Sequence, residues 1–400
     1  MALDVAALRN RFPAIRAEGA PAFLDGPAGT QVPESVVEAI AAALIDASSN
    51  VGGSFAASRA SGAVVEAARS AAADFLGGAP SEVVFGPNMT SLTFAFSRAV
   101  ASEWRAGDRI VLSRLDHDAN VTPWVRAAEE RGVDVSFARL HDDDVTLDLD
   151  HLESLIDART RLVAVTACSN AFGSLVDVAR VARAAHGVGA LCYVDAVHLA
   201  PHQRIDVMKS GVDALVCSAY KFFGPHVGVL WGRRELLERL PAYKVRPAPA
   251  DPPGKFETGT PSFAMLAGVE AAVEHIASLG EGDNRSQRLD DAYELIATHE
   301  SGLGRRFLNG LPPGVEVWGR PSMEGRVTTF AISVEGRTAT EVAAAMGMRG
   351  INVWAGHHYA VEPMAALGLL ESGGLVRIGF VNTSTIEEVD MVHEALGALC

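Results

Sequence analysis

The sequence lacks the features of a protein that binds nucleic acid or a membrane. Its 49 acidic residues outnumber its 34 basic residues and give a formal charge of −15, and such a surface repels phosphate backbones and anionic membranes. No run approaches the roughly 20 apolar residues that cross a bilayer. Residues 1–20 have neither the apolar core nor the cleavage site of a signal peptide. We therefore predict a cytoplasmic protein without a nucleic-acid or membrane partner.

Cysteine is scarce, and nucleotide-binding motifs are missing. The 4 cysteines have neither C-x-x-C nor His-paired spacing, so the sequence predicts no metal site and no disulfide framework. The patterns G-x-x-x-x-G-K-[ST] and G-x-G-x-x-G are both absent, which argues against a nucleoside triphosphate or a dinucleotide as ligand. An anionic ligand must instead find a local cationic pocket.

Short apolar runs alternate with amphipathic stretches from about residue 75 to residue 235, as in βα units around a mostly parallel sheet. The helical stretches Ser61–Leu76 and Val178–His186 place Ala, Val and Leu at spacings of three and four, which favours helices that cover a sheet. The runs predicted as strands are Val83–Phe85, Arg109–Ser113, Val133–Ala138, Leu162–Thr166, Leu191–Asp195, Ala214–Ser218 and Gly228–Trp231.

With 400 residues, the chain is too long for one ordinary core. We expect a large domain over residues 21–280, a smaller α+β domain over 281–400 and an N-terminal segment, 1–20, that packs on the small domain. Residues 244–259 are rich in Pro and Gly, which predicts an irregular, exposed segment before a long helix. The small domain is predicted to hold a helix pair and the strands Val315–Val317, Arg326–Ile332, Gly350–Val353 and Leu375–Phe380.

Two charged residues follow predicted strands and are candidates for chemistry. Lys221 comes three residues after Ala214–Ser218, and a lysine held in an apolar or cationic environment loses its proton readily and can attack an aldehyde. Asp195 ends Leu191–Asp195, and a buried carboxylate needs a cationic partner such as a protonated ring nitrogen. The alternatives are a surface lysine and an ordinary helix cap.

The stretch VVFGPNMTSLTF predicts a strand, a tight turn and a helix that begins near Thr90 and Ser91. Amides and hydroxyls at the start of a helix bind phosphate. An ordinary N-cap has the same pattern, so this stretch alone leaves both interpretations open.

Eight motifs occur in one order along nearly the whole chain. They are FLDGPAG, VVFGPNMTS, LDHDANVTPW, SNAFGS, VDAVHLAPH, SAYKFFGP, ETGTPS and RIGFVNT. With these motifs the chain resembles the class V aminotransferase group of fold type I enzymes that use pyridoxal 5′-phosphate (PLP), closest to the cysteine desulfurase branch. The resemblance implies an α/β fold with a mostly parallel seven-stranded sheet in the large domain, a smaller C-terminal α+β domain, PLP as cofactor and a homodimer.

The resemblance also implies a role for individual residues around the cofactor ring. Lys221 looks like the lysine that forms the Schiff base, and Asp195 looks like the partner of the pyridinium nitrogen. His117 falls where the family stacks an imidazole on the ring, a position with a catalytic role. Asn170 falls where the family bonds the phenolic oxygen or the substrate. His198 replaces the Gln usual at that oxygen and can still donate one hydrogen bond.

Other positions of the motifs match the phosphate and carboxylate sites of the family. Met89 (through its amide), Thr90 and Ser218 would hold the phosphate, and Thr260 would reach it from the partner subunit, so the active site would be shared within a homodimer. Arg377 lines up with the arginine that clamps the substrate carboxylate, a task suited to a planar bidentate donor.

One segment departs from the cysteine desulfurase pattern. Desulfurases carry a loop cysteine that takes up sulfur as a persulfide, and the corresponding segment here, WAGHHYAVEPM, has Tyr359 at that place. A phenol cannot form a persulfide, so the usual desulfurase route is not expected. Tyr359 and His358 would instead face the substrate. Tyr220 stands where the family has a His before the lysine.

We predict that the enzyme acts on a small amino acid by β-elimination. Lys221 would remove the Cα proton of cysteine or an S-substituted cysteine, and Tyr359 would protonate the departing thiolate, which leaves pyruvate and ammonia. Tyr359 could also simply pack in its loop. The alternatives are transamination, racemisation or epimerisation with Tyr359 or His358 as second acid, and a PLP-binding scaffold without turnover.

Overall fold

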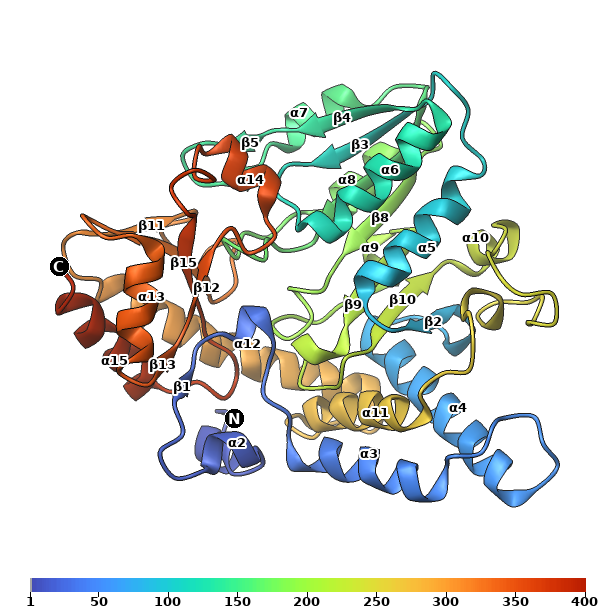
Figure 1. Cartoon of the computed structure of the whole chain (residues 1–400), viewed down its shortest axis with the longest axis horizontal. Helices are drawn as coiled ribbons and strands as arrows, with labels where there is room; N and C mark the ends of the chain where they lie inside the picture. The colour runs from blue at the N-terminus through green and yellow to red at the C-terminus, as the bar shows by residue number, and fades with distance from the viewer. Residues whose placement is uncertain (1) are drawn as a thin grey trace.

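The computed structural model describes residues 2–400, and its larger domain is built on a seven-stranded sheet with the order β2-β10-β9-β8-β7-β3-β4 (Figure 1). β10 runs antiparallel to both of its neighbours, while β9, β8, β7, β3 and β4 pair in parallel. This confirms the predicted mostly parallel sheet. The strands are β2 (Val83–Gly86), β3 (Arg109–Ser113), β4 (Asp134–Ala138), β7 (Thr160–Thr166), β8 (Leu191–Asp195), β9 (Ala214–Ser218) and β10 (Gly228–Gly232).

Helices cover both faces of this sheet. Successive strand residues point to opposite faces, and because these strands are apolar throughout, both faces need to be buried. In β8, Cys192 and Val194 belong to the core cluster that also holds residues of the helices on one face, and Tyr193 belongs to the cluster on the other face. α4 (Ala56–Leu76), α8 (Val178–His186) and α11 (Phe263–Ala277) lie on the first face, and α5 (Met89–Ala101) and α6 (Thr122–Arg131) lie on the second. α3 (Glu34–Asp46) packs on α11 and α4.

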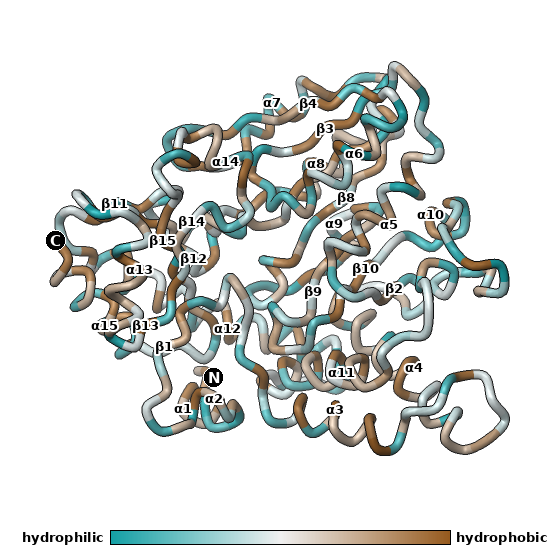
Figure 2. The backbone as a smooth tube through the Cα atoms, in the orientation of Figure 1, coloured by the Kyte–Doolittle hydropathy of each residue, from teal (hydrophilic) through white to brown (hydrophobic). Residues whose placement is uncertain are grey.

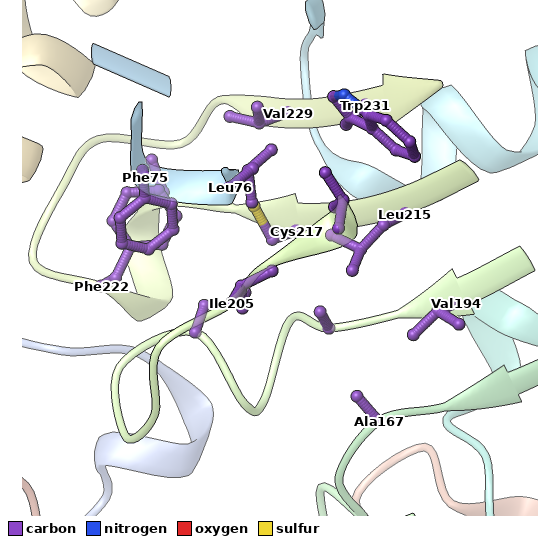
Figure 3. Packing of buried hydrophobic residues seen from close by; sticks show 14 of the residues in the cluster. Phe75, Leu76, Ala167, Val194, Ile205, Leu215, Cys217, Phe222, Val229 and Trp231 are labelled. Atoms are coloured by element: carbon purple, nitrogen blue, oxygen red, sulfur yellow. The ribbon is translucent and has the colours of Figure 1, made fainter. Parts of the chain in front are cut away.

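The first of these clusters is the main core of the molecule. Figure 3 shows, at the end of α4, Phe75 against Phe222 and Leu76 beside Cys217 of β9, with Leu215 of β9 and Trp231 of β10 in the same cluster. Along the tube in Figure 2, brown apolar stretches mark these strands, and teal stretches gather in the surface loops. The continuous apolar character of the strands, read from the sequence, thus reflects burial on both faces.

The smaller domain holds a four-stranded antiparallel sheet with the order β11-β12-β15-β14. The prediction that Gly350–Val353 belongs to this sheet was wrong. Its central residues form β13 (Ile351–Asn352), which pairs with β1 (Ala22–Phe23) near the N-terminus. The strands of the sheet are β11 (Val315–Trp318), β12 (Thr329–Val334), β14 (Trp354–Gly356) and β15 (Leu375–Gly379).

Four helices, not the predicted pair, accompany this sheet in the described residues. They are α12 (Arg285–Asn309), α13 (Ala339–Gly347), α14 (Val361–Ala366) and α15 (Ile386–Gly397). The long α12 packs on α4 and α11 of the large domain and on α15 of the small domain. It therefore connects the two domains along its length (Figure 1).

The N-terminal segment, with α1 (Val5–Arg9) and α2 (Pro13–Arg16), contacts both domains. Arg9 donates to the carbonyl oxygen of Thr383 at 2.7 Å and to Glu388 at 2.9 Å, while Phe12 packs edge-on against Phe223 and His275. The division at residues 20 and 280 stays a prediction. Within residues 2–400, we find no helix with both the length and the apolar character that a bilayer-spanning segment requires.

Candidate active site

One pocket lies at the carboxyl ends of the central parallel strands, where open α/β sheets bind their ligands. Asp195 ends β8, Lys221 closes the 3₁₀ turn Ala219–Lys221 after β9, and α5 begins at Met89 beside them. The residues that line this pocket are Met89, Thr90, His117, Thr166, Cys168, Asn170, Asp195, Val197, His198, Tyr220 and Lys221. Segments far apart in the sequence thus meet around one lysine and one carboxylate.

Lys221 is buried, with 8 % of its surface exposed. Its Nζ atom donates a hydrogen bond to the carbonyl oxygen of Pro27. Burial and then the guanidinium of Arg377 lower the pKa of the Lys221 ammonium to about 7, against a smaller opposing effect of Asp195. Lys221 therefore loses its proton far more readily than an ordinary lysine.

Asp195 is buried, and one of its carboxylate oxygens accepts a hydrogen bond from the amide of Val197 at 2.8 Å. The other oxygen makes no hydrogen bond within residues 2–400. Burial raises the pKa of Asp195 to about 6, although the Val197 amide and Lys221 act in the opposite direction. The carboxylate thus keeps one acceptor free for a cationic partner in the pocket.

His117 follows β3 and its ring is held in one orientation. The Nδ1 atom accepts a hydrogen bond from the amide of Ala119 at 3.0 Å, which leaves the proton of the neutral ring on Nε2. Burial, and then the charges of Lys221 and Arg377, lower the pKa of His117 to about 3. His117 is therefore a neutral ring that lines the pocket and also stacks on Tyr359, with centroids 5.4 Å apart and planes 11° apart.

Asn170 and Arg377 meet on one side of the pocket. Arg377, on β15, donates through Nη1 to the carbonyl oxygen of Asn170 at 2.9 Å, and burial lowers its pKa to about 10. The Oδ1 atom of Asn170 and the Nε atom of Arg377 are buried without a hydrogen-bond partner in the described residues. Such orphaned polar atoms are rare unless a ligand satisfies them, and their chemistry suits an anionic or hydroxyl-bearing ligand.

The loop of His358 and Tyr359 lies over this side of the pocket. The carbonyl oxygen of His358 accepts from Nδ2 of Asn170 at 2.8 Å, and that of Tyr359 accepts from the amide of Asp118 at 2.8 Å. Both loop residues have positive φ angles, 53° and 57°, a strained conformation for side chains of this size. Tyr359 stays 66 % exposed, while burial lowers the pKa of His358 to about 3.

The residues predicted to hold a phosphate are not all in one place. Ser218 accepts a hydrogen bond from the amide of Met89 at 3.1 Å, so these two predicted residues adjoin beside Thr90 at the start of α5. The amide of Ser91 is taken by the N-cap Asn88. Thr260 is exposed and lines a separate pocket of about 530 Å³ together with Phe85, Phe256 and Met265. Within one chain, therefore, Thr260 does not share the pocket of Lys221.

Two carboxylates near the site were missed by the sequence analysis. Asp25, in the FLDGPAG motif, has a buried Oδ1 without a partner in the described residues, and burial raises its pKa against the charges of Arg377 and Lys221. Asp116 accepts from the Ser113 hydroxyl and from Asn120, and burial raises its pKa to about 8. The signal for both was an acidic residue inside a quoted motif.

Comparisons with known proteins show which family the chain is similar to. A family model described as Aminotransferase class-V matches residues 22–392. An uncharacterized protein of Mycobacterium tuberculosis is 32% identical, and a cysteine desulfurase of Pectobacterium carotovorum is 30% identical, each with 100% of both chains covered. A solved cysteine desulfurase from Thermococcus onnurineus superposes with a TM-score of 0.89 at 27% identity, over 100% of this chain and 98% of that one.

Proposed function

Since this chain belongs to the class V aminotransferase family, whose enzymes depend on PLP and act on amino acids, we propose that it uses PLP to cleave the Cβ–S bond of cysteine or an S-substituted cysteine. The observation that carries the proposal is the side chain at position 359. The site keeps the amine, the carboxylate and the arginine, whereas the loop over it presents a phenol in place of a thiol.

The residues present fit the cofactor. The free acceptor of Asp195 suits a protonated ring nitrogen, and the orphaned Oδ1 and partnered amide of Asn170 lie beside the pocket. Thr90 and Ser218 would hold the phosphate at the positive end of α5, and Met89 would add its amide once the phosphate replaces Ser218 as its acceptor. When bound, PLP draws the electrons of a broken Cα bond into its ring, which Asp195 keeps protonated.

The protein side chains have separate tasks in this reaction. The amine of Lys221, whose ammonium pKa is lowered to about 7 by burial and by Arg377, would attach the cofactor and then take the Cα proton of the substrate. Arg377 binds the substrate carboxylate with the donors that Asn170 leaves free and so selects the Cα bond that breaks. The neutral ring of His117 would stack on the cofactor, and its stacking on Tyr359 holds the ring in position.

The cysteines do not suit a persulfide route. Cys192 and Cys217 are buried within β8 and β9, and burial raises the pKa of both thiols. Cys168 lines the pocket but is fully buried, donates to the carbonyl oxygen of Gly173 at 3.4 Å and also has a raised pKa. Because the thiolate is the reactive form, these three thiols are poor sulfur acceptors. Cys400 is exposed at the C-terminus.

Tyr359 completes the proposed elimination as proton donor to the departing thiolate. Its ring lies at the mouth of the site, stacked on His117 and 66 % exposed. A phenol there can deliver a proton and regain it from solvent. His358 would contact the substrate beside Asn170, to which its carbonyl oxygen is bonded.

We extend the proposal to a homodimer in which Thr260 reaches the phosphate in the partner subunit. The exposed position of Thr260 supports this, as do the exposed apolar side chains of Val37, Leu44 and Ile45 on α3. Inactive Lys221→Ala and Thr260→Ala chains, mixed after partial unfolding, should then regain activity in the mixed dimer that carries one intact site. A sedimentation experiment that finds only monomers would contradict the proposal.

The products of a substrate panel test the reaction. Purified protein with PLP is incubated with cysteine and a series of S-alkylcysteines. We expect pyruvate and ammonia, together with hydrogen sulfide from cysteine or one thiol from each S-alkylcysteine, and Lys221→Ala is the control. Alanine with sulfane sulfur would instead identify a desulfurase. A sulfur-containing keto acid would identify a transaminase, and solvent deuterium at Cα with loss of optical purity would identify a racemase. If no amino acid changed the absorption spectrum, the protein would be a PLP-binding scaffold without turnover.

A further inference from the structure

A buried polar cluster lies where the large domain meets the small domain, directly behind the pocket. His198 and His202, after β8, are 3 % and 2 % exposed, and their rings lie edge to face with centroids 5.4 Å apart. Each ring has its hydrogen-bond partner in the small domain. Nε2 of His198 bonds Oγ1 of Thr329 on β12 at 2.9 Å, and Nδ1 of His202 bonds Oε2 of Glu300 on α12 at 2.7 Å.

Glu300 is an unusual residue at this place because its carboxylate is buried. Its Oε2 also lies 3.1 Å from the hydroxyl of Thr328, which has a nearer acceptor in the carbonyl oxygen of Phe380 at 2.8 Å. Its Oε1 is buried without a partner in the described residues. A buried carboxylate with an unpartnered oxygen costs stability unless it has a compensating role. Its strongest contact fixes Nδ1 of His202, so the carboxylate sets the orientation of that ring.

The contacts leave His198 with a single free nitrogen. Its Nδ1 atom makes no hydrogen bond within residues 2–400, and the residue lines the pocket of Lys221. Burial lowers the pKa of His198 well below its usual value, and His202, Lys221, Arg377 and His117 act in the same direction. The neutral ring carries one N–H, which lies on Nδ1 in the tautomer in which the Thr329 hydroxyl donates to Nε2.

We infer that His202 and Glu300 are positioning residues of the cofactor site: they hold His198 so that its Nδ1–H donates to the phenolic oxygen of PLP. This inference rests on the proposed function. The charged or titratable groups that face the two rings are Glu300, Arg326 and Arg377 from the small domain and Lys221 and His117 from the pocket. A movement of the small domain would therefore alter a hydrogen bond at the cofactor.

The pH titration of the visible absorption of the bound cofactor, without substrate, tests this role. A donor to the phenolic oxygen stabilises the more negative, deprotonated form and lowers the titration midpoint. Glu300→Gln, His202→Phe and Thr329→Val should each raise the midpoint by about half a pH unit or more. The matched control is His275→Gln, since His275 is also a buried histidine but packs against Phe12 and Phe223, away from the pocket.

A second background separates positioning from general packing. In His198→Gln, whose amide has no tautomer, addition of Glu300→Gln should leave the midpoint unchanged even if the melting temperature falls. Equal midpoints in the wild-type protein and all three single variants would overturn the inference while the cofactor assignment stands. A wild-type protein that never becomes coloured with PLP would overturn the proposed function, and this inference with it.

Discussion

Two lysines of this protein are buried to a similar extent but differ in the hydrogen bonds and charges around their ammonium groups. Lys221 and Lys255 are 8 % and 7 % exposed. Nζ of Lys255 donates to the carbonyl oxygens of Glu238 and Leu240, each at 2.9 Å, and lies 5.2 Å from the centre of the Phe256 ring. Nζ of Lys221 also lies near a ring, 5.0 Å from the centre of Tyr220, but it has one carbonyl partner, Pro27, and otherwise faces the pocket. One ammonium is saturated with partners, and the other keeps donors free.

The charges around the two ammonium groups explain what burial alone does not. Burial lowers the pKa of both lysines, but the largest charge effect on Lys255 comes from Glu238, which raises its pKa again. The largest charge effect on Lys221 comes from Arg377, which lowers its pKa further, to about 7. A buried lysine becomes a nucleophile where a second cation opposes its protonation and a pocket gives access to it.

Substitution of each lysine in turn should give the largest difference in turnover. Lys221→Ala removes the attachment point, so we expect turnover to fall by about a thousandfold or more. Lys255→Met should keep turnover and lower the melting temperature, because two buried carbonyl oxygens lose their donor. Borohydride reduction followed by peptide mass spectrometry should find the cofactor on Lys221 in both the wild-type protein and Lys255→Met. A label on Lys255 would break the comparison.

Two buried carboxylates, Asp195 and Asp116, allow a similar comparison, and the second largest loss of activity is expected here. Asp195, with a pKa of about 6, is ionised at pH 7, whereas Asp116, with a pKa of about 8, is largely protonated there. Asp195→Asn removes a charge that the cofactor ring needs, and kcat/KM at pH 7 should fall about a hundredfold. Asp116→Asn replaces a neutral group by another, so a loss of more than about tenfold would show that charge is not the reason.

Much of the large domain could be predicted from the sequence because its strands are buried on both faces. β3, β8 and β9 have the predicted bounds, since continuous apolar runs between turn residues leave few alternatives. Less of the small domain could be predicted, because β13 has only two residues and pairs with β1, more than 300 positions away. A pairing at that separation leaves no periodicity in the sequence.

The candidate site divides in the same way. Lys221, Asp195 and the start of α5 follow from strand ends, and the structure brings them to one pocket. The bond between His202 and Glu300 spans 98 positions, and the stacking of Tyr359 on His117 depends on a loop in a strained conformation. Contacts of this kind depend on how two domains pack, which no local pattern encodes.

Tyr359 can be tested through the leaving group. If its hydroxyl protonates the departing thiolate, Tyr359→Phe should lower kcat about tenfold or more with S-alkylcysteines. The loss should nearly vanish with S-arylcysteines that carry electron-withdrawing groups, because their thiolates leave without a proton. No loss with Tyr359→Phe, but an equal loss across the series with Tyr359→Leu, would assign Tyr359 to the stacking contact with His117 and contradict its role as proton donor.

The smallest expected effect is the pH dependence of cofactor attachment, which examines the environment of Lys221 directly. Only the free amine attacks, so the rate rises with pH through the folded-state pKa of about 7. Attachment of PLP to the apoprotein, followed by absorbance, should be about fivefold slower at pH 6 than at pH 7 and less than about twofold faster at pH 8. Arg377→Gln removes the cation that opposes protonation, so its profile should move to higher pH. A wild-type rate that continues to rise about tenfold per pH unit up to pH 10 would show that Lys221 has the pKa of an ordinary lysine. Lys221 and Lys255 would then differ only in where they lie in the fold.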